Sequence, residues 1–208
     1  MIARINKLWL LIIICLIPLC TLFIDIAFER LGSNPIQELH IRLGDWTLRL
    51  LWLTLLITPL QTITQWRGMA IYRQVFGLYS FFYASLHVLV YVTLDNDLEW
   101  HLMLIDIVQS PYVWFGVIAY SIILALGLTS SKYAKKRLGK NWKRLHRLIY
   151  FAAIAGMIHY FWQLKGNLAE PLFYLVTIIL LLGFRVLVWL KKRQFAKWMI
   201  PKSRELQE

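Results

Sequence analysis

The sequence predicts an all-α integral membrane protein: a bundle of six transmembrane helices that binds heme, with both termini in the cytoplasm. Three observations lead there, namely composition, the length of the apolar runs and the distribution of positive charge. Of the 208 residues, 59% are hydrophobic and 16% are charged, and the mean hydropathy is +0.58. Soluble domains are far less apolar. We therefore treat residues 1–208 as a single transmembrane domain.

Six apolar runs are long enough to cross a bilayer. They cover residues 8–28, 46–64, 75–94, 111–128, 145–164 and 171–190. The first run has no small-residue cleavage site after it, so we expect a retained helix and not a signal peptide. Pro59 lies inside the second run and must free a helix carbonyl, which neighbouring groups have to satisfy. No internal repeat is evident between the runs.

The segments between the runs are expected to be loops. Residues 30–45 contain Gly, Ser, Asn and Pro, which favours a loop with at most a short interfacial helix. Residues 95–110 carry four acidic side chains and no Lys or Arg. His40 and His101 lie in these two segments, and we expect both to be ordinary surface histidines.

Positive charge sets the orientation through the positive-inside rule. All but four of the 23 Lys and Arg residues fall on the side of the amino terminus; the four are Arg30, Arg42, Arg49 and Lys165. The most basic segment, residues 130–147, is an anchor on anionic membrane lipid, a docking surface for an acidic redox partner, or a contact for a flavin phosphate. The same asymmetry explains the net charge of +12, so no nucleic acid is expected as a partner.

Three histidines lie within the predicted spans. His87 is in the third run, while His146 and His159 stand near the two ends of the fifth. Ionisable side chains inside a spanning helix are costly and usually functional. The third and fifth runs both cross from inside to outside, which brings His87 and His159 to similar depth. Small residues precede both histidines and leave room for a flat group: Ser80, Ala84, Ala152, Ala155 and Gly156.

We therefore predict that His87 and His159 are the axial ligands of one heme iron. Two imidazole ligands leave no open iron position, which suits electron transfer. Zinc is disfavoured because no cysteine or carboxylate lies at the same depth. His146 sits about 140° around an ideal helix from His159, so one straight face does not carry both. It is a candidate ligand of a second heme, a partner for a propionate or flavin, or a cap at the membrane surface.

Four stretches carry a family resemblance. They are LLITPL at 55–60, GLYSFFYASLH at 77–87, PYVWFG at 111–116 and LGKNWKRLHRLIYFAAIAGMIHYFW at 138–162. In order and spacing they are similar to the MsrQ (YedZ) family, the heme-binding membrane subunits of bacterial periplasmic methionine sulfoxide reductase systems, within the ferric-reductase-like transmembrane group. By this resemblance His87, His146 and His159 match the family's intramembrane histidines. The wider group usually has two histidines on its third segment, and this chain has one.

The resemblance implies a multi-pass protein of the bacterial inner membrane that binds heme b, one or two per chain, and FMN. It would carry electrons from the quinol pool, or from a cytoplasmic flavin reductase, to a periplasmic molybdenum-containing methionine sulfoxide reductase that repairs oxidised periplasmic proteins. The chain would then be a non-catalytic electron-transfer subunit. No Gly-rich nucleotide fingerprint follows the sixth run, so electrons are expected from another molecule. The alternatives are a stand-alone transmembrane ferric or oxygen reductase, and a transporter or assembly factor without heme.

Overall fold

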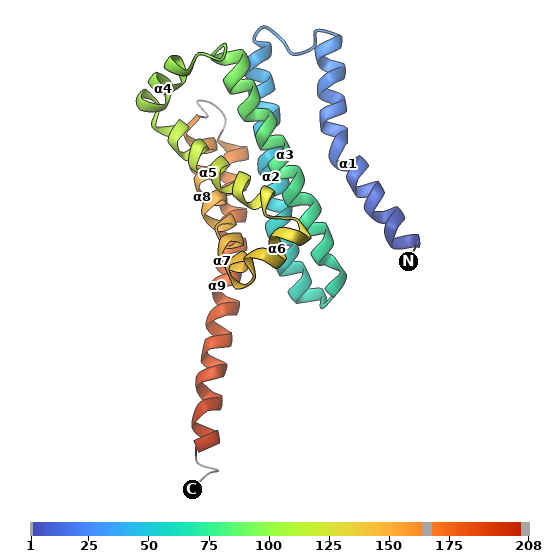
Figure 1. The fold of residues 1–208 in the computed structure, drawn as a ribbon, viewed down its shortest axis with the longest axis vertical. Coiled ribbons are helices and arrows are strands. Elements are labelled where there is room, and N and C mark those ends of the chain that lie inside the picture. The colour runs from blue at the N-terminus through green and yellow to red at the C-terminus, as the bar shows by residue number, and fades with distance from the viewer. Residues whose placement is uncertain (1, 164–167, 205–208) are drawn as a thin grey trace.

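The structure is a computed structural model that describes residues 2–163 and 168–204 (Figure 1). Its elements are α1 (Ile2–Ala27), α2 (Pro35–Thr64), a 3₁₀ turn (Arg67–Met69), α3 (Ala70–Val90), a π-helical turn (Tyr91–Asp95), α4 (Trp100–Gln109), α5 (Pro111–Leu128), α6 (Lys132–Leu138), α7 (Lys140–His146), α8 (Ile149–Gln163) and α9 (Ala169–Arg204). All regular structure in these residues is helical, which confirms the all-α prediction.

Five helical segments of the described chain are long and apolar enough to cross a membrane. They are Leu8–Ala27, Pro35–Thr64, Ala70–Asp95, Pro111–Leu128 and Ala169–Lys191. This confirms a multi-pass membrane fold. α8 has 15 residues, which gives about 22 Å of rise and falls short of a full span by itself. Residue 164, the last of the fifth predicted span, and Lys165 lie outside the described residues, so the fifth predicted span, residues 145–164, stays a prediction.

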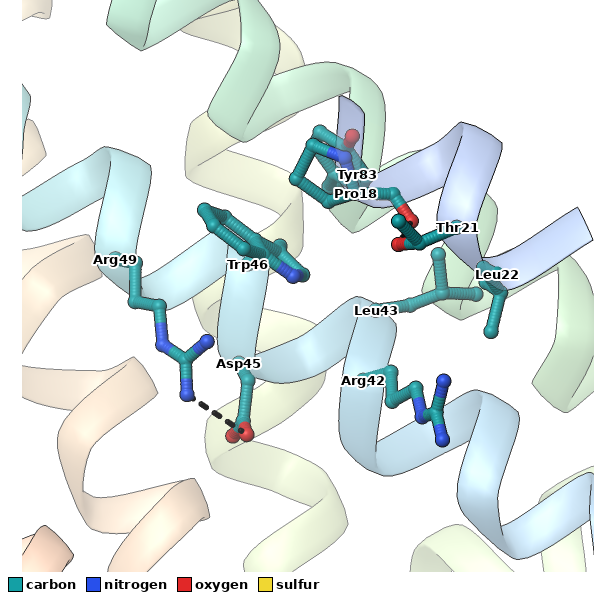
Figure 2. A pocket seen from close by; sticks show the side chains of 9 residues that line it. All are labelled: Pro18, Thr21, Leu22, Arg42, Leu43, Asp45, Trp46, Arg49 and Tyr83. Atoms are coloured by element: carbon teal, nitrogen blue, oxygen red, sulfur yellow. Dashed lines mark hydrogen bonds and ion pairs between the residues drawn. The ribbon is translucent and has the colours of Figure 1, made fainter. Parts of the chain in front are cut away.

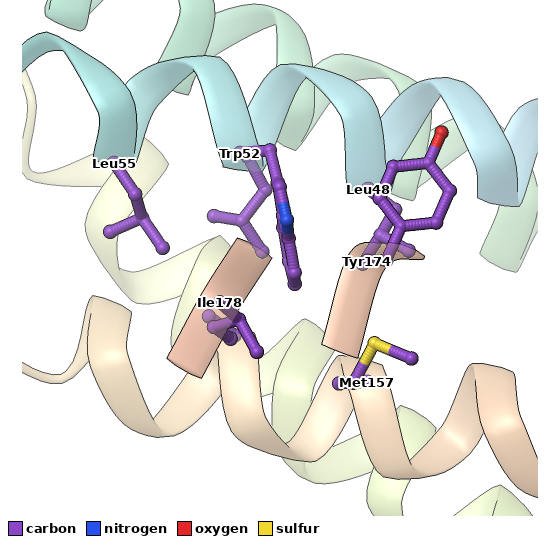
Figure 3. Packing of buried hydrophobic residues seen from close by; sticks show 8 residues of the cluster. Leu48, Trp52, Leu55, Met157, Tyr174 and Ile178 are labelled. Carbon is purple, nitrogen blue, oxygen red and sulfur yellow. The ribbon is translucent and has the colours of Figure 1, made fainter. Parts of the chain in front are cut away.

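Two helical hairpins form the centre of the bundle. α2 packs along α3, α5 packs along α8, and α3 contacts α5 to join them. α9 covers α2 and α8 and extends beyond the other helices at its carboxyl end, while α1 stands beside α3 (Figure 1). Figure 3 shows the buried cluster that fastens α2, α8 and α9 together, which includes Leu48, Trp52, Met157, Tyr174 and Ile178.

The guanidinium of Arg185 satisfies the carbonyl that the proline in α2 leaves without its helix donor. Pro59 has no N–H to donate to the carbonyl four residues earlier, which belongs to Leu55. Arg185 of α9 donates to that carbonyl at 2.6 Å and to its own helix at the Leu181 carbonyl. The guanidinium also lies over the ring of Tyr150, 5.1 Å from its centre. Arg185 therefore couples α9 to the freed carbonyl of α2.

Three segments that the sequence predicts as loops are helical. Residues 35–45 form the first turns of α2, α4 occupies most of the acidic segment, and α6 and α7 occupy most of the basic segment. The side chain of Asn34 accepts a hydrogen bond from the Gln37 N–H at 3.2 Å, and Pro35 follows at the start of the helix. Asn at the cap with Pro after it is a helix-start pattern, so the loop prediction for this segment was wrong.

The predicted fifth span is broken near its start. α7 ends at His146 and α8 begins at Ile149, so the expectation that one helix carries both His146 and His159 was wrong. Trp142 donates its indole N–H to the Thr129 carbonyl at 2.9 Å, which holds α7 against the end of α5. We call this end of the bundle, with α6 and α7, the basic end.

Candidate metal-ligand site: two facing histidines

His87 of α3 and His159 of α8 face each other at the opposite end of the bundle, which we call the histidine end. Their ring centres lie 6.3 Å apart and the ring planes cross at 84°. Although the two residues are far apart in the sequence, the structure brings together the pair that the depth argument selects. The arrangement leaves the two imidazoles in position to bind a common atom.

A backbone carbonyl orients each ring. Nδ1 of His87 lies 3.1 Å from the carbonyl oxygen of His40, and Nδ1 of His159 lies 2.9 Å from that of Tyr112. A carbonyl only accepts, so Nδ1 carries the proton in both rings and donates it. Nε2 then holds the lone pair of the neutral imidazole, which is the form that binds metals.

The ring separation fits two imidazoles on one metal ion. A metal–nitrogen bond is about 2 Å long, and the ring nitrogen stands about 1 Å from the ring centre, so two rings on opposite sides of one ion have centres about 6 Å apart. Within the described residues no group of three or more His, Cys, Asp and Glu side chains is placed to hold a metal. Two protein ligands are too few for a structural zinc site. They suit an ion that a macrocycle already holds in its plane, as porphyrin holds iron.

Room for a flat group exists beside His159. A Cβ placed on Gly156, three residues before it, meets nothing within 4 Å. The small residues nearer the bundle's middle do not leave such room. Ala84 and Ala152 are buried against Ile123 of α5, so these two close the contact between helices.

In each hairpin, a backbone carbonyl and a glycine contact the histidine ring in the same way. A Cβ on Gly44 would lie 3.4 Å from Cε1 of His87, and one on Gly116 would lie 3.0 Å from Cε1 of His159. The carbonyl that orients each ring stands 47 residues before its histidine in both cases. The positions of the histidine, of the residue whose carbonyl orients it and of the glycine in the first hairpin each recur 72 residues later in the second. The hairpins α2–α3 and α5–α8 are therefore structurally equivalent, a repeat that the sequence does not reveal.

His146 lies apart from this pair, at the basic end. Its ring stacks on Trp142 with centres 4.0 Å apart, and its Nε2 lies 3.1 Å from the hydroxyl oxygen of Thr129. Its contacts are therefore with protein side chains.

The shift of 72 residues places Gln74 at the position equivalent to His146. Gln74 donates its side-chain amide to the Ser130 carbonyl at 3.3 Å, next to the threonine that His146 contacts. The basic end therefore presents one imidazole and one amide where the histidine end presents two imidazoles.

His40 is the residue of this site that the sequence argument missed. Its ring lies edge-on to His87 with centres 4.9 Å apart, and its Nε2 pairs with the carboxylate of Asp95. Its side chain is 11% exposed, so the expectation of a surface histidine was wrong. Once residues 35–45 are known to be helical, His40 lies one turn before Gly44, which faces His87. That position would indicate that His40 is near the ring of His87. His101, by contrast, is exposed on α4 as expected.

Comparisons with known proteins point to the same chemistry. Residues 43–157 match a family described as the ferric reductase like transmembrane component. The chain is 39% identical over 166 residues to the protein-methionine-sulfoxide reductase heme-binding subunit MsrQ of Xanthomonas axonopodis pv. citri (strain 306), covering 80% of this chain and 76% of the relative. It is 37% identical over 190 residues to MsrQ of Bordetella pertussis (strain Tohama I), covering 90% and 92%.

Proposed function

This chain belongs to the ferric reductase-like transmembrane family and to the MsrQ heme-binding subunits, and we propose from this premise that it is a b-type cytochrome. It carries electrons through the membrane to a methionine sulfoxide reductase. The observation that carries the proposal is the facing pair of His87 and His159, with ring centres 6.3 Å apart and both Nδ1 atoms bonded to carbonyls.

Heme b, when bound, supplies one-electron chemistry at its iron. His87 and His159 would hold the iron, each through the Nε2 atom that the hydrogen bond at Nδ1 leaves free. The carbonyls of His40 and Tyr112 fix the tautomer and direct each ring, as groups around metal ligands commonly do. Two imidazole ligands from the protein would suit an iron that transfers electrons and not one that binds substrate or oxygen.

We propose one heme b per chain. A second heme at His146 would require its Nε2 to leave the Thr129 hydroxyl, and the equivalent position in the other hairpin offers the amide of Gln74 in place of an imidazole. A single heme at the histidine end requires no such change. His146 then serves as a contact that ties α7 to the end of α5.

We propose that α8 is the sixth span and that both termini are cytoplasmic, in the bacterial inner membrane. The exposed Lys and Arg side chains of α6 and α7 then face the cytoplasm, and the histidine pair lies towards the periplasm. This position supports delivery of electrons to a periplasmic molybdenum-containing catalytic subunit that repairs oxidised methionine in periplasmic proteins. Electrons enter from quinol or from a cytoplasmic flavin reductase, and FMN binds at the basic end, where lysines and arginines suit its phosphate.

The test is a reduced-minus-oxidised spectrum of the purified full-length protein, with heme measured per chain. We expect a b-type spectrum that His87→Ala and His159→Ala each remove. His101→Ala is the matched control, because His101 is exposed on α4 and should leave the spectrum unchanged. Gel filtration and circular dichroism check that the variants fold. Stoichiometric heme that survives in both ligand variants would refute the assignment.

A further inference from the structure

A cavity of about 250 Å³ lies between α1, α2 and α3 at the histidine end (Figure 2). Gly44, which stands between the cavity-lining residues Leu43 and Asp45, faces the ring of His87 and so fixes this position. The volume is below the range of about 300–1,000 Å³ that is typical of sites for drug-sized ligands. The cavity therefore suits a small polar group whose remaining part lies outside it.

The cavity has one charged side and one mainly apolar side. Arg42, Asp45 and Arg49 line it from α2. Their spacing of three and four residues puts them on one face of the helix, and we call them the charged row. Figure 2 shows their charged ends on the side away from Pro18 and Tyr83. A ligand there contacts charge on one side and apolar surface on the other.

Both arginines of the charged row have a nitrogen left for a ligand. Arg42 donates through Nε and Nη1 to two carboxylates. Arg49 donates through Nε to the Tyr174 hydroxyl and through Nη2 to Glu170. Among the described residues, Nη2 of Arg42 and Nη1 of Arg49 have no hydrogen-bond partner. Guanidinium nitrogens match the oxygens of a phosphate well, so the row offers donors to a phosphate.

The carboxylate of Asp45 has capacity left for a donor. Its side chain is 16% exposed, and its ion pair with Arg49 is long, at 3.5 Å. Among the described residues this carboxylate accepts no hydrogen bond. A largely buried carboxylate without a donor favours a ligand that supplies one, and a cationic donor makes the strongest such bond.

The surrounding charges favour a ligand with one charge of each sign. The residues that line the cavity include two arginines and one carboxylate. The arginines also pair with three carboxylates outside the lining, namely Asp25, Glu38 and Glu170. A plain anion is attracted by the nearer charges and repelled by the carboxylates behind them, and a plain cation meets the reverse. A zwitterion adds no net charge and has a partner in the row for each of its ends.

We propose that the cavity binds the head group of a phospholipid that carries a primary amine, such as phosphatidylethanolamine. Its phosphate accepts hydrogen bonds from Arg42 and Arg49, and its ammonium donates to Asp45. The acyl chains lie along α1, which carries exposed apolar side chains in the turns before the cavity: Ile13, Ile14 and Ile17. This inference goes beyond the proposed function and does not require the heme.

Such a lipid would fasten α1 to the bundle. Tyr79 and Tyr83 of α3 donate their hydroxyls to the backbone of α1, at 3.2 Å and 2.8 Å. On the side of α2, Arg42 pairs with Asp25 of α1, and the cavity lies beside this pair. A head group in the cavity adds contacts between α1 and α2, and a ligand that binds only the folded chain stabilises it.

The test is native mass spectrometry of the purified full-length protein in detergent. The protein is mixed with equal amounts of three lipids that have the same acyl chains: phosphatidylethanolamine, phosphatidylcholine and phosphatidylglycerol. The quaternary ammonium of the choline lipid cannot donate a hydrogen bond, and the glycerol lipid carries no cation. We expect phosphatidylethanolamine to bind about 10- to 100-fold tighter than either, the range for one hydrogen bond to a charged group.

Asp45→Asn keeps the shape of the side chain but removes its charge. It should weaken binding of phosphatidylethanolamine about tenfold and leave that of phosphatidylcholine within about twofold, because only the primary amine loses its partner. Asp97→Asn is the matched control, because Asp97 is exposed in the segment before α4 and does not line the cavity. It should leave all three affinities unchanged. Circular dichroism checks that both variants fold.

Three results would overturn the lipid site. They are equal binding of the three lipids, tightest binding of phosphatidylglycerol, and an Asp45→Asn variant that binds phosphatidylethanolamine as wild type does or loses all three lipids alike. Water-soluble glycerophosphoethanolamine, added in excess, separates a lipid from a free head group: it should leave the lipid bound, and displacement would overturn the assignment to a lipid. The heme spectrum of the same sample tests the proposed function separately.

Discussion

A single methyl group at Gly116 tests the ligand geometry most directly. A Cβ at this position would lie 3.0 Å from both Cε1 and Nδ1 of His159, whereas carbon atoms in contact prefer about 3.5–4.0 Å. The ring of His159 must therefore move by about 0.5 Å. Such a shift lengthens the 2.9 Å hydrogen bond to Tyr112 and exceeds the tolerance of about 0.2 Å on metal–ligand distances.

We expect Gly116→Ala to weaken heme binding about 10- to 100-fold, the usual effect of disturbing a group that orients a metal ligand. Gly44→Ala is its counterpart in the other hairpin. A Cβ there would lie 3.4 Å from His87, which is an ordinary contact, so its affinity should stay within about threefold of wild type. Both changes favour the helix by up to about 1 kcal/mol, so helix propensity does not explain a difference. The assay is hemin titration of apoprotein; equal affinities of Gly116→Ala and wild type would refute the geometry.

Three further substitutions test separate parts of the structure. Gly156→Leu should lower heme affinity at least about tenfold while the apoprotein folds, because only bound porphyrin would meet the side chain; Gly183→Leu on α9, also in open space, is the control, and equal losses in both would contradict the porphyrin position. Arg185→Met should lower the free energy of unfolding by about 1–3 kcal/mol, since it leaves the Leu55 carbonyl without a donor; chemical denaturation measures this, and an unchanged midpoint would count against it. His146→Ala should keep the full b-type spectrum, and loss of half of the heme would establish a second site.

The sequence was sufficient to select the facing histidines because depth in a membrane is nearly one-dimensional. Charge asymmetry orients the helices, and residue counts from their ends then give depth with little dependence on packing. The same counts place His87 and His159 level with each other. They contain no information about rotation of one helix relative to another, so the facing of the two rings, with centres 6.3 Å apart, needed coordinates.

What the sequence could not give depends on contacts between distant segments. His40 is drawn into the site because Asn34 caps a helix that carries it past His87, and the glycine and proline nearby suggested a loop instead. The break after His146 follows from the bond between Trp142 and the end of α5. The break carries no proline or glycine that would mark it in the sequence.

The equivalence of the two hairpins explains why the ends of the bundle differ in chemistry. At the histidine end, the 72-residue shift relates identical residues: histidine to histidine and glycine to glycine. At the basic end it relates Gln74 to His146, and both side chains are bonded to the last turn of α5 or the residues just after it. The two hairpins thus carry matched histidines at one level only. Where the equivalent residues agree, two imidazoles face each other; where they differ, each side chain is hydrogen-bonded to residues next to the end of α5.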